Sequence, residues 1–177
     1  MKNSELISGL IENNLFEKTI ELSRNEYLKT AGSVDTNLYY IEKGTLKIFV
    51  LDEGEERIIR FGYKENIIVS LDSFINEKPS DLYFQALKKT HLKVISKHNF
   101  LNYLKQFPDF SIIWIAILED LVLQQMEREK DLLTNSPKLR YERVLKRSPQ
   151  LFQEVSNHQI AKYLRMSPET LSRLKNS

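Results

Sequence analysis

The feature that most constrains the fold is a series of short strand-like segments between residues 38 and 95. Runs of branched and aromatic residues alternate there with turn residues, about every 8 to 12 residues. The segments are Tyr39–Ile41, Leu46–Val50, Arg57–Phe61, Ile67–Leu71, Tyr83–Leu87 and His91–Ile95. This spacing predicts an antiparallel jelly-roll-like β-roll.

The turns between these segments are rich in charged residues and glycine. Glu42-Lys43-Gly44-Thr45 separates the first two, which predicts a β-hairpin from Leu38 to Val50. The later turns are predicted at Asp52-Glu53-Gly54-Glu55, at Gly62 to Asn66 and at Lys88-Lys89-Thr90.

Helical spacing replaces the strand pattern on both sides of this region. Leu6 to Leu22 has apolar residues at intervals that predict one or two short helices. Asn99–Gln106 is predicted as a helix, with Ser96 as a possible N-cap and Pro108 ending it. A long helix should then run from Asp109 to Leu133. The chain is therefore expected to be an α+β protein.

The long helix carries two apolar faces. One has a spacing of alternating threes and fours that is typical of a coiled-coil seam, at Ile115, Leu118, Val122, Gln125 and Glu129. The other contains Ile113, Ile117 and Leu121. A helix that is apolar on two sides needs two partners, so we expect one face to pack on the roll and the other on a second copy of the chain. A helix buried within a monomer is the alternative.

Charged residues are distributed unevenly along the chain. Residues 136–177 contain nine Lys or Arg against three Glu, a net charge of +6, whereas the preceding residues carry −4. Such asymmetry indicates an anion-binding module, with nucleic acid as the commonest polyanion, although a solvated basic helix face would look the same. Together with the hinge-like Thr134-Asn135-Ser136-Pro137, it predicts a roll over 1–108, a dimerisation helix and hinge over 109–135, and a DNA-binding domain over 136–177. Ser136 is placed to cap the first helix of that domain, with Pro137 in its first turn.

Composition narrows the setting of the protein. The absence of cysteine excludes disulfides, thiol catalysis and cysteine-ligated metals, and it fits a reducing compartment. The N-terminus does not read as a signal peptide, and the longest apolar stretch, Ile112–Leu118, is too short to span a bilayer. We therefore expect a cytoplasmic protein with no membrane partner.

The segment from Ser156 to Arg173 reads as two short helices joined by a tight turn, which predicts a helix-turn-helix. Ser156 is placed to cap the first helix, and Ser167 and Pro168 to begin the second. Ile160, Leu164, Met166 and Leu171 supply the apolar core, and Ala161 lets the helices cross closely. An ordinary helical hairpin is the alternative. The candidate DNA-binding residues are Ser156, His158, Ser167, Pro168, Glu169, Thr170, Ser172, Arg173 and Lys175.

Nearly the whole chain resembles the Crp/Fnr family of transcription regulators. The resemblance is carried by Gln159-Ile160-Ala161, by Ser167-Pro168-Glu169-Thr170-Leu171-Ser172-Arg173, and by Leu38-Tyr39-Tyr40-Ile41-Glu42-Lys43-Gly44. It implies that Glu169 and Arg173 contact bases and that Ser167 and Thr170 contact phosphates. It also implies a homodimer on a pseudo-palindromic double-stranded DNA site, with RNA polymerase as a further candidate partner.

The sequence departs from the family in three places. Where cyclic-nucleotide binders of the family carry Gly-Glu and, further on, Arg-Ser, this chain has Val69-Ser70 and Ser80-Asp81. Without the phosphate-holding arginine we expect a degenerate pocket (Val69, Ser70, Leu71, Ser80, Asp81), no cAMP and no cofactor, although an unidentified effector could still bind. The usual turn glycine is Arg165, which should need a positive φ. We also expect the helix-turn-helix to lack the usual wing hairpin.

Other functions have weaker support. His91, His98 and His158 are scattered and predict no metal site, and the chain has no glycine-rich phosphate-binding motif. We therefore expect no enzyme; a cupin-like enzyme would need clustered histidine and carboxylate ligands. A ligand-binding or protein-interaction module of the same fold that has lost DNA binding stays open.

Overall fold

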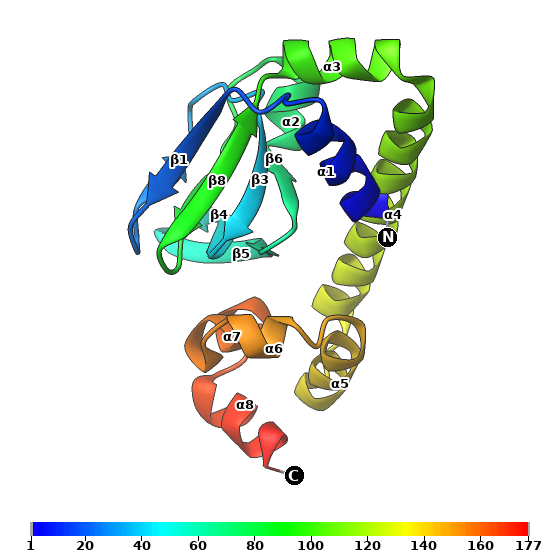
Figure 1. The fold of residues 1–177 in the computed structure, drawn as a ribbon. Coiled ribbons are helices and arrows are strands. Elements are labelled where there is room, and N and C mark those ends of the chain that lie inside the picture. Colours follow the sequence, from blue (N-terminus) through cyan, green and yellow to red (C-terminus); the bar gives the residue numbers. More distant parts are fainter. Residues whose placement is uncertain (1, 177) are drawn as a thin grey trace.

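Two antiparallel sheets form a roll in the computed structural model, which describes residues 2–176 (Figure 1). In spatial order, one sheet consists of β1 (Lys18–Leu22), β8 (Thr90–Ile95), β3 (Leu38–Lys43) and β6 (Ile67–Val69). The other consists of β2 (Tyr27–Lys29), β7 (Tyr83–Ala86), β4 (Thr45–Asp52) and β5 (Glu55–Tyr63). The predicted α+β, jelly-roll-like fold is therefore confirmed.

Helices surround this roll. They are α1 (Lys2–Glu12), α2 (Leu71–Asn76), α3 (Lys97–Gln106), α4 (Pro108–Leu133), α5 (Pro137–Arg147), α6 (Leu151–Glu154), α7 (Asn157–Tyr163) and α8 (Pro168–Lys175). Figure 1 shows α3 across one end of the roll, α1 between the roll and α4, α4 running down its side, and α5–α8 gathered at the other end. Across residues 2–176, no helix combines the length and the apolar character that crossing a membrane requires.

The predicted hairpin from Leu38 to Val50 is wrong. β3 and β4 belong to different sheets, so the chain crosses between the sheets at Gly44. Gly44 has a φ of +107°, and a Cβ built there would lie 2.3 Å from Oγ1 of Thr90, so only glycine fits this crossing. A true hairpin joins β4 to β5, where Asp52 pairs with Glu55 around the predicted turn.

The helix predicted over Leu6–Leu22 is right only for its first part. α1 ends at Glu12, and the following residues form β1, in which Lys18 to Leu22 pair with β8. Leu71 likewise begins α2 rather than ending a strand, and β2 was not predicted. In these segments the pairing with distant strands decides the structure, and local spacing does not reveal it.

Three apolar clusters hold the protein together. The first lies between the two sheets and includes Tyr39, Ile48 and Phe84. The second packs α1, α3 and α4 on one end of the roll around Phe100 and Trp114. The third joins the outer face of β4 and β5 to the C-terminal helices, through Phe49, Ile58, Phe61, Val144, Leu151, Ile160 and Leu171. Strand β4 is therefore covered on both faces, which explains its continuous apolar run.

The predicted helix starts are confirmed in three places. The hydroxyls of Ser96, Ser136 and Ser167 accept hydrogen bonds from the backbone amides of Asn99, Leu139 and Thr170. Each serine is an N-cap in extended conformation. Helix α4 matches its predicted limits to within one residue.

Candidate functional site

Helices α7 and α8 form a compact pair joined by a tight turn. Ile160, Ala161, Leu164 and Leu171 are almost completely buried between them and the neighbouring helices. Arg165 in the turn has a φ of +52°, as the sequence predicted for the position of the usual glycine. The turn therefore holds α8 at a fixed angle to α7.

One side of α8 faces solvent. Pro168, Glu169, Ser172 and Arg173 are exposed, and Thr170 is half-buried beside its hydrogen bond to Ser167. The backbone amide of Glu169 and the Ser167 hydroxyl lower the pKa of the Glu169 carboxyl, and Arg173 adds to the effect. Helix α8 thus presents an ionised carboxylate in its first turn and a guanidinium one turn further on, both exposed.

The remaining candidate DNA-binding residues lie around this side. His158 is exposed, and Ser156 is the exposed N-cap of α7, although its hydroxyl makes no capping hydrogen bond. Nζ of Lys175 lies 2.7 Å from Oδ1 of Asn157, to which it donates a hydrogen bond. Lys175 therefore ties the end of α8 to the start of α7.

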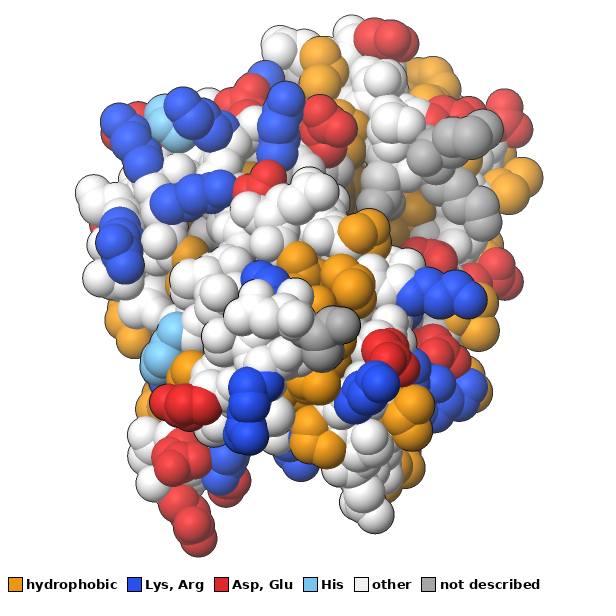
Figure 2. All heavy atoms as spheres, turned by 90° about the horizontal axis from the view of Figure 1, so that it is seen from below, with side chains coloured by type: hydrophobic (Ala, Val, Ile, Leu, Met, Phe, Trp, Pro, Cys, Tyr) orange, Lys and Arg blue, Asp and Glu red, His pale blue; other side chains and the backbone are white. Residues whose placement is uncertain are grey.

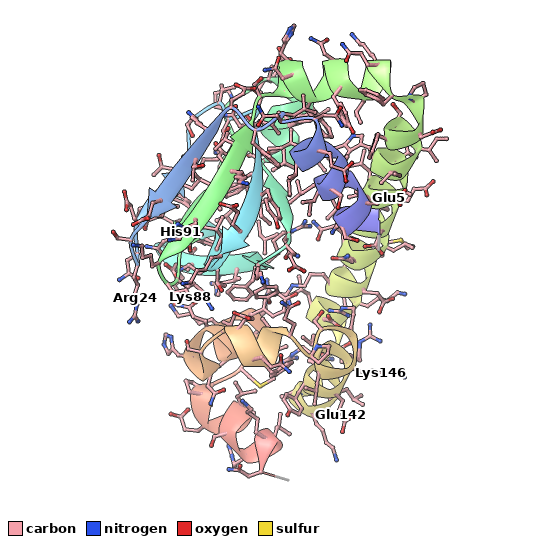
Figure 3. The ribbon with its side chains drawn as sticks, in the orientation of Figure 1. Glu5, Arg24, Lys88, His91, Glu142 and Lys146 are labelled. Atoms are coloured by element: carbon pink, nitrogen blue, oxygen red, sulfur yellow. The ribbon has the colours of Figure 1, made fainter. Side chains whose placement is uncertain are left out.

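Several basic side chains of the C-terminal helices form ion pairs within the protein. Arg143 and Arg147 on α5 bind the carboxylates of Asp131 and Glu127 on α4. Figure 3 shows Glu142 and Lys146 on the outward side of α5, and the end view in Figure 2 shows basic side chains interspersed with acidic and apolar ones. The charge that the sequence assigned to a DNA-binding surface is therefore partly structural.

The roll and the C-terminal helices share an interface that the sequence did not reveal. The rings of Phe61 and Tyr163 pack edge to face with centroids 5.6 Å apart, and Lys88 binds Glu154 at 2.7 Å. Figure 3 shows Lys88 at the edge of the roll that faces α6 and α7. Beside this interface lies an open groove of about 1120 Å³ between the β4–β5 hairpin, α4 and the α7–α8 turn.

Helix α4 leaves one apolar stripe uncovered. The predicted seam residues Ile115, Val122, Gln125 and Glu129 are exposed, whereas Leu118 packs against the cluster at the end of the roll. The exposed apolar residues of α4 are instead Ile112, Ile115, Val122, Leu123, Met126 and Leu133. They lie within one sector of the helix, which is wide enough for a helix partner.

The family resemblance assigns nucleotide binding to the segment from Val69 to Asp81. Most of the candidate pocket residues in this segment are hydrogen-bonded or packed within the protein itself. Ser70 and Ser80 are buried, and their hydroxyls bond Asp72 and the amide of Leu82. Val69 and Leu71 pack against the apolar cluster, and Asp81 is exposed.

The charges around this segment do not suit an anion. Residues 70–81 contain three carboxylates, one lysine and no arginine. The buried Lys29 donates to the carbonyls of Thr30 and Leu82, and burial lowers its pKa while Asp72, Asp35 and Asp81 act in the opposite direction. The residues present here therefore do not fit a cyclic phosphate.

Comparisons with known proteins agree with this fold. Structures similar to the chain include a mutant of CooA from Carboxydothermus hydrogenoformans (TM-score 0.78, 19% identity, 97% of this chain and 82% of that one). FixK2 from Bradyrhizobium japonicum gives a TM-score of 0.73 at 14% identity, covering 90% of this chain and 82% of that one. The c-di-GMP responsive global regulator CLP of Xanthomonas campestris gives 0.71 at 17% identity, covering 96% and 90%.

At these identities the structures establish the shared fold alone. No curated protein is similar enough in sequence to be matched to the chain. A family model, described as the cyclic nucleotide-binding domain, matches residues 19–107, just over half of the chain and the whole roll from β1 to α3. The chain therefore belongs to the cyclic nucleotide-binding domain family.

Proposed function

We propose that the protein is a Crp/Fnr-like, DNA-binding transcription regulator that uses α7 and α8 as a helix-turn-helix. The observation that carries the proposal is the exposed side of α8, with Glu169 in its first turn and Arg173 one helical turn further on. A helix of this kind enters the major groove with its N-terminal residues at the base edges. Arginine then reads guanine, and glutamate accepts from N4 of cytosine.

The carboxylate of Glu169 lies in the first turn of α8, where it can accept a hydrogen bond from a base edge. Ser167 and Thr170 lie beside it at the helix start, where backbone amides favour a phosphate. The base contacts proposed here come from α8.

A homodimer follows from the exposed stripe of α4. Pairing two such stripes would bury Ile112, Ile115, Val122 and Met126 of each copy, in a seam shifted from the one predicted by sequence. A dimer of this kind places two recognition helices on half-sites about one DNA turn apart, which requires a pseudo-palindromic operator.

We further propose that the effector is not cAMP. The internal hydrogen bonds around Ser70 and Ser80, the neighbouring carboxylates and the missing arginine all weaken an anion site there. Calorimetry with cAMP should give no heat of binding, and micromolar affinity would overturn this part. Action in the cytoplasm and a contact with RNA polymerase would follow from the regulator's role.

Selection of bound sites from random DNA, followed by mutation, tests the main proposal. Arg173→Ala should cost about 1 to 3 kcal/mol on the selected site and relax one base position. Lys146→Ala removes a charge from the outward side of α5 and is the control, with a small and sequence-independent loss. Equal losses for Arg173→Ala on selected and random DNA would make Arg173 a phosphate contact.

A second candidate function is a protein-interaction module that has lost DNA binding. It is supported by the contacts of Arg140, Arg143 and Arg147 within the protein. Because these residues bind the protein's own groups, the basic charge left for DNA is smaller than the sequence suggests. A module that has lost DNA binding and contacts another protein would produce an empty selection. Within residues 3–176, no three His, Asp or Glu side chains are grouped so that they could hold a metal ion, as the cupin-like alternative would need.

A further inference from the structure

Arg128 connects three parts of the protein at one point. It lies on α4, is almost completely buried, and its Nη2 donates to the carbonyl oxygens of Ile58 at 3.3 Å and Tyr163 at 2.7 Å. Ile58 belongs to β5 of the roll and Tyr163 to α7. Cζ of Arg128 also lies 3.7 Å from the centroid of the Tyr163 ring. One side chain therefore holds the long helix, the roll and the α7–α8 pair together.

The contacts of Arg128 fall at the end of α7, just before the turn. The last carbonyls of a helix have no partner within the helix and attract cations. Arg128 takes the carbonyl of Tyr163, and Arg140 of α5 takes those of Leu164 and Arg165. The turn that leads into α8 is therefore fixed from two sides by arginines of two other helices.

Keeping an arginine in this place has an energetic cost that points to a defined role. Burial lowers the pKa of Arg128, and nearby Tyr163 and Asp131 act in the opposite direction. Such a group is stable only while its carbonyl and ring partners stay in position. The docked arrangement of the roll and α7 is therefore the one in which Arg128 is satisfied.

Other contacts support the same arrangement. Lys162 of α7 lies 3.6 Å from the carboxylate of Glu56 on β5, and that carboxylate also binds the buried Lys47 at 2.7 Å. In this arrangement the exposed side of α8, including Glu169 and Arg173, stays free of the roll (Figure 1). The C-terminal helices can therefore dock on the roll while the exposed side of α8 stays accessible to DNA.

We propose that Arg128 is a positioning residue for DNA recognition, and that the docked state it holds is the state that binds DNA without an effector. This inference rests on the proposed function, since it assumes that α8 reads DNA. The roll then acts as a scaffold that orients α8. Any effector would have to act on the contacts of Arg128 with β5 and α7.

The first test is Arg128→Met, which keeps the length of the side chain and removes its donors. Loss of two hydrogen bonds to a charged group should weaken binding to the selected operator by about tenfold or more. Amide exchange at β5 and α7 should rise in parallel, and the dimer mass should stay unchanged. Lys130→Met is the matched control, because this exposed lysine pairs with Glu127 on its own helix and should change neither readout.

The second test fixes the docked state directly. The chain has no cysteine, so Lys88→Cys with Glu154→Cys gives one defined pair across the roll and α6 that a short bis-maleimide can join. Cross-linking should preserve operator binding in the otherwise native chain and restore it in Arg128→Met. Loss of operator binding on cross-linking would overturn the proposal and make the docked state the inactive one.

The two levels of the proposal fail differently. If the native chain selects no DNA site at all, the proposed function is wrong. If the native chain selects a site and Arg128→Met binds it as tightly as the control, the proposed function stands and the role of Arg128 is refuted.

Discussion

The carboxylate of Asp131 on α4 accepts a hydrogen bond of 2.9 Å from Nε of Arg143 on α5. Asp131 is completely buried, and its other oxygen binds Arg147. This contact fixes the angle between the long helix and the C-terminal helices, at the hinge that the sequence placed near Thr134 to Pro137.

Replacing Asp131 with asparagine should destabilise the protein strongly. The substitution removes the buried anion of two guanidinium groups, which are partly exposed and keep Glu127 as a partner, so the loss should be about 1 to 3 kcal/mol. Urea denaturation should show a lower free energy of unfolding for the variant. The decrease should be smaller if the hinge opens and exposes the two arginines to water. Asp120→Asn, at an exposed position of the same helix, should change stability by less than about 0.5 kcal/mol. A loss for Asp131→Asn as small as that of the control would contradict the clamp.

Arg165→Gly should leave the protein as stable or make it more stable, by up to about 1 kcal/mol. The residue has a φ of +52°, which strains a side chain but not glycine, and only its backbone carbonyl holds Arg140. Arg165→Val should lower the melting temperature, because a β-branched residue tolerates this conformation least. Equal melting temperatures for the two variants would mean that the turn relaxes away from positive φ.

Val122→Glu should prevent dimer formation. Val122 is 59% exposed in the single chain and lies in the middle of the apolar stripe of α4, where a carboxylate would be buried against a second copy. Sedimentation should give the mass of one chain. Gln124→Glu introduces the same charge on the opposite side of the helix and should leave the dimer intact. If the variant and the control have the same mass, the interface lies elsewhere.

Glu17→Gln should show a pH-dependent loss of stability. The carboxylate of Glu17 accepts from the hydroxyl and amide of Ser96 and from Nδ2 of Asn99, and the hydrogen bond from the Ser96 hydroxyl is the main cause of its lowered pKa. Because the pKa of Glu17 in the folded protein lies below its ordinary value of 4.5, the ionised carboxylate stabilises the protein above pH 4.5. This contribution is lost as the pH falls through the folded pKa.

Urea denaturation of Glu17→Gln at pH 7 and pH 3 measures this effect. At pH 7 the variant should be less stable by no more than about 1 kcal/mol, since the group is exposed. At pH 3 the difference should shrink. A difference that stays constant over this range would assign the effect to packing and not to charge.

The sequence by itself determined the features that depend on local chemistry. The serines at positions 96, 136 and 167 predicted the helix starts, because a short hydroxyl side chain can satisfy a free amide there. The turn at Arg165 and the exposed side of α8 also followed from local spacing. The strand series predicted the roll, because turn residues at regular intervals leave few other arrangements.

Only the tertiary structure decided which strands pair and which charged side chains bind groups inside the protein. Nothing local distinguishes a hairpin from the crossing at Gly44, since the difference is the closeness of Thr90, which lies far along the chain. The apolar spacing of α4 was compatible with more than one seam until the roll covered Leu118. Arg143 and Arg147 belong to the basic charge that the sequence assigned to an anion-binding module, and their partner Asp131 is brought to them by the packing of α5 on α4. The contacts of Arg128 with Ile58 and Tyr163 likewise arise only when the helices and the roll come together.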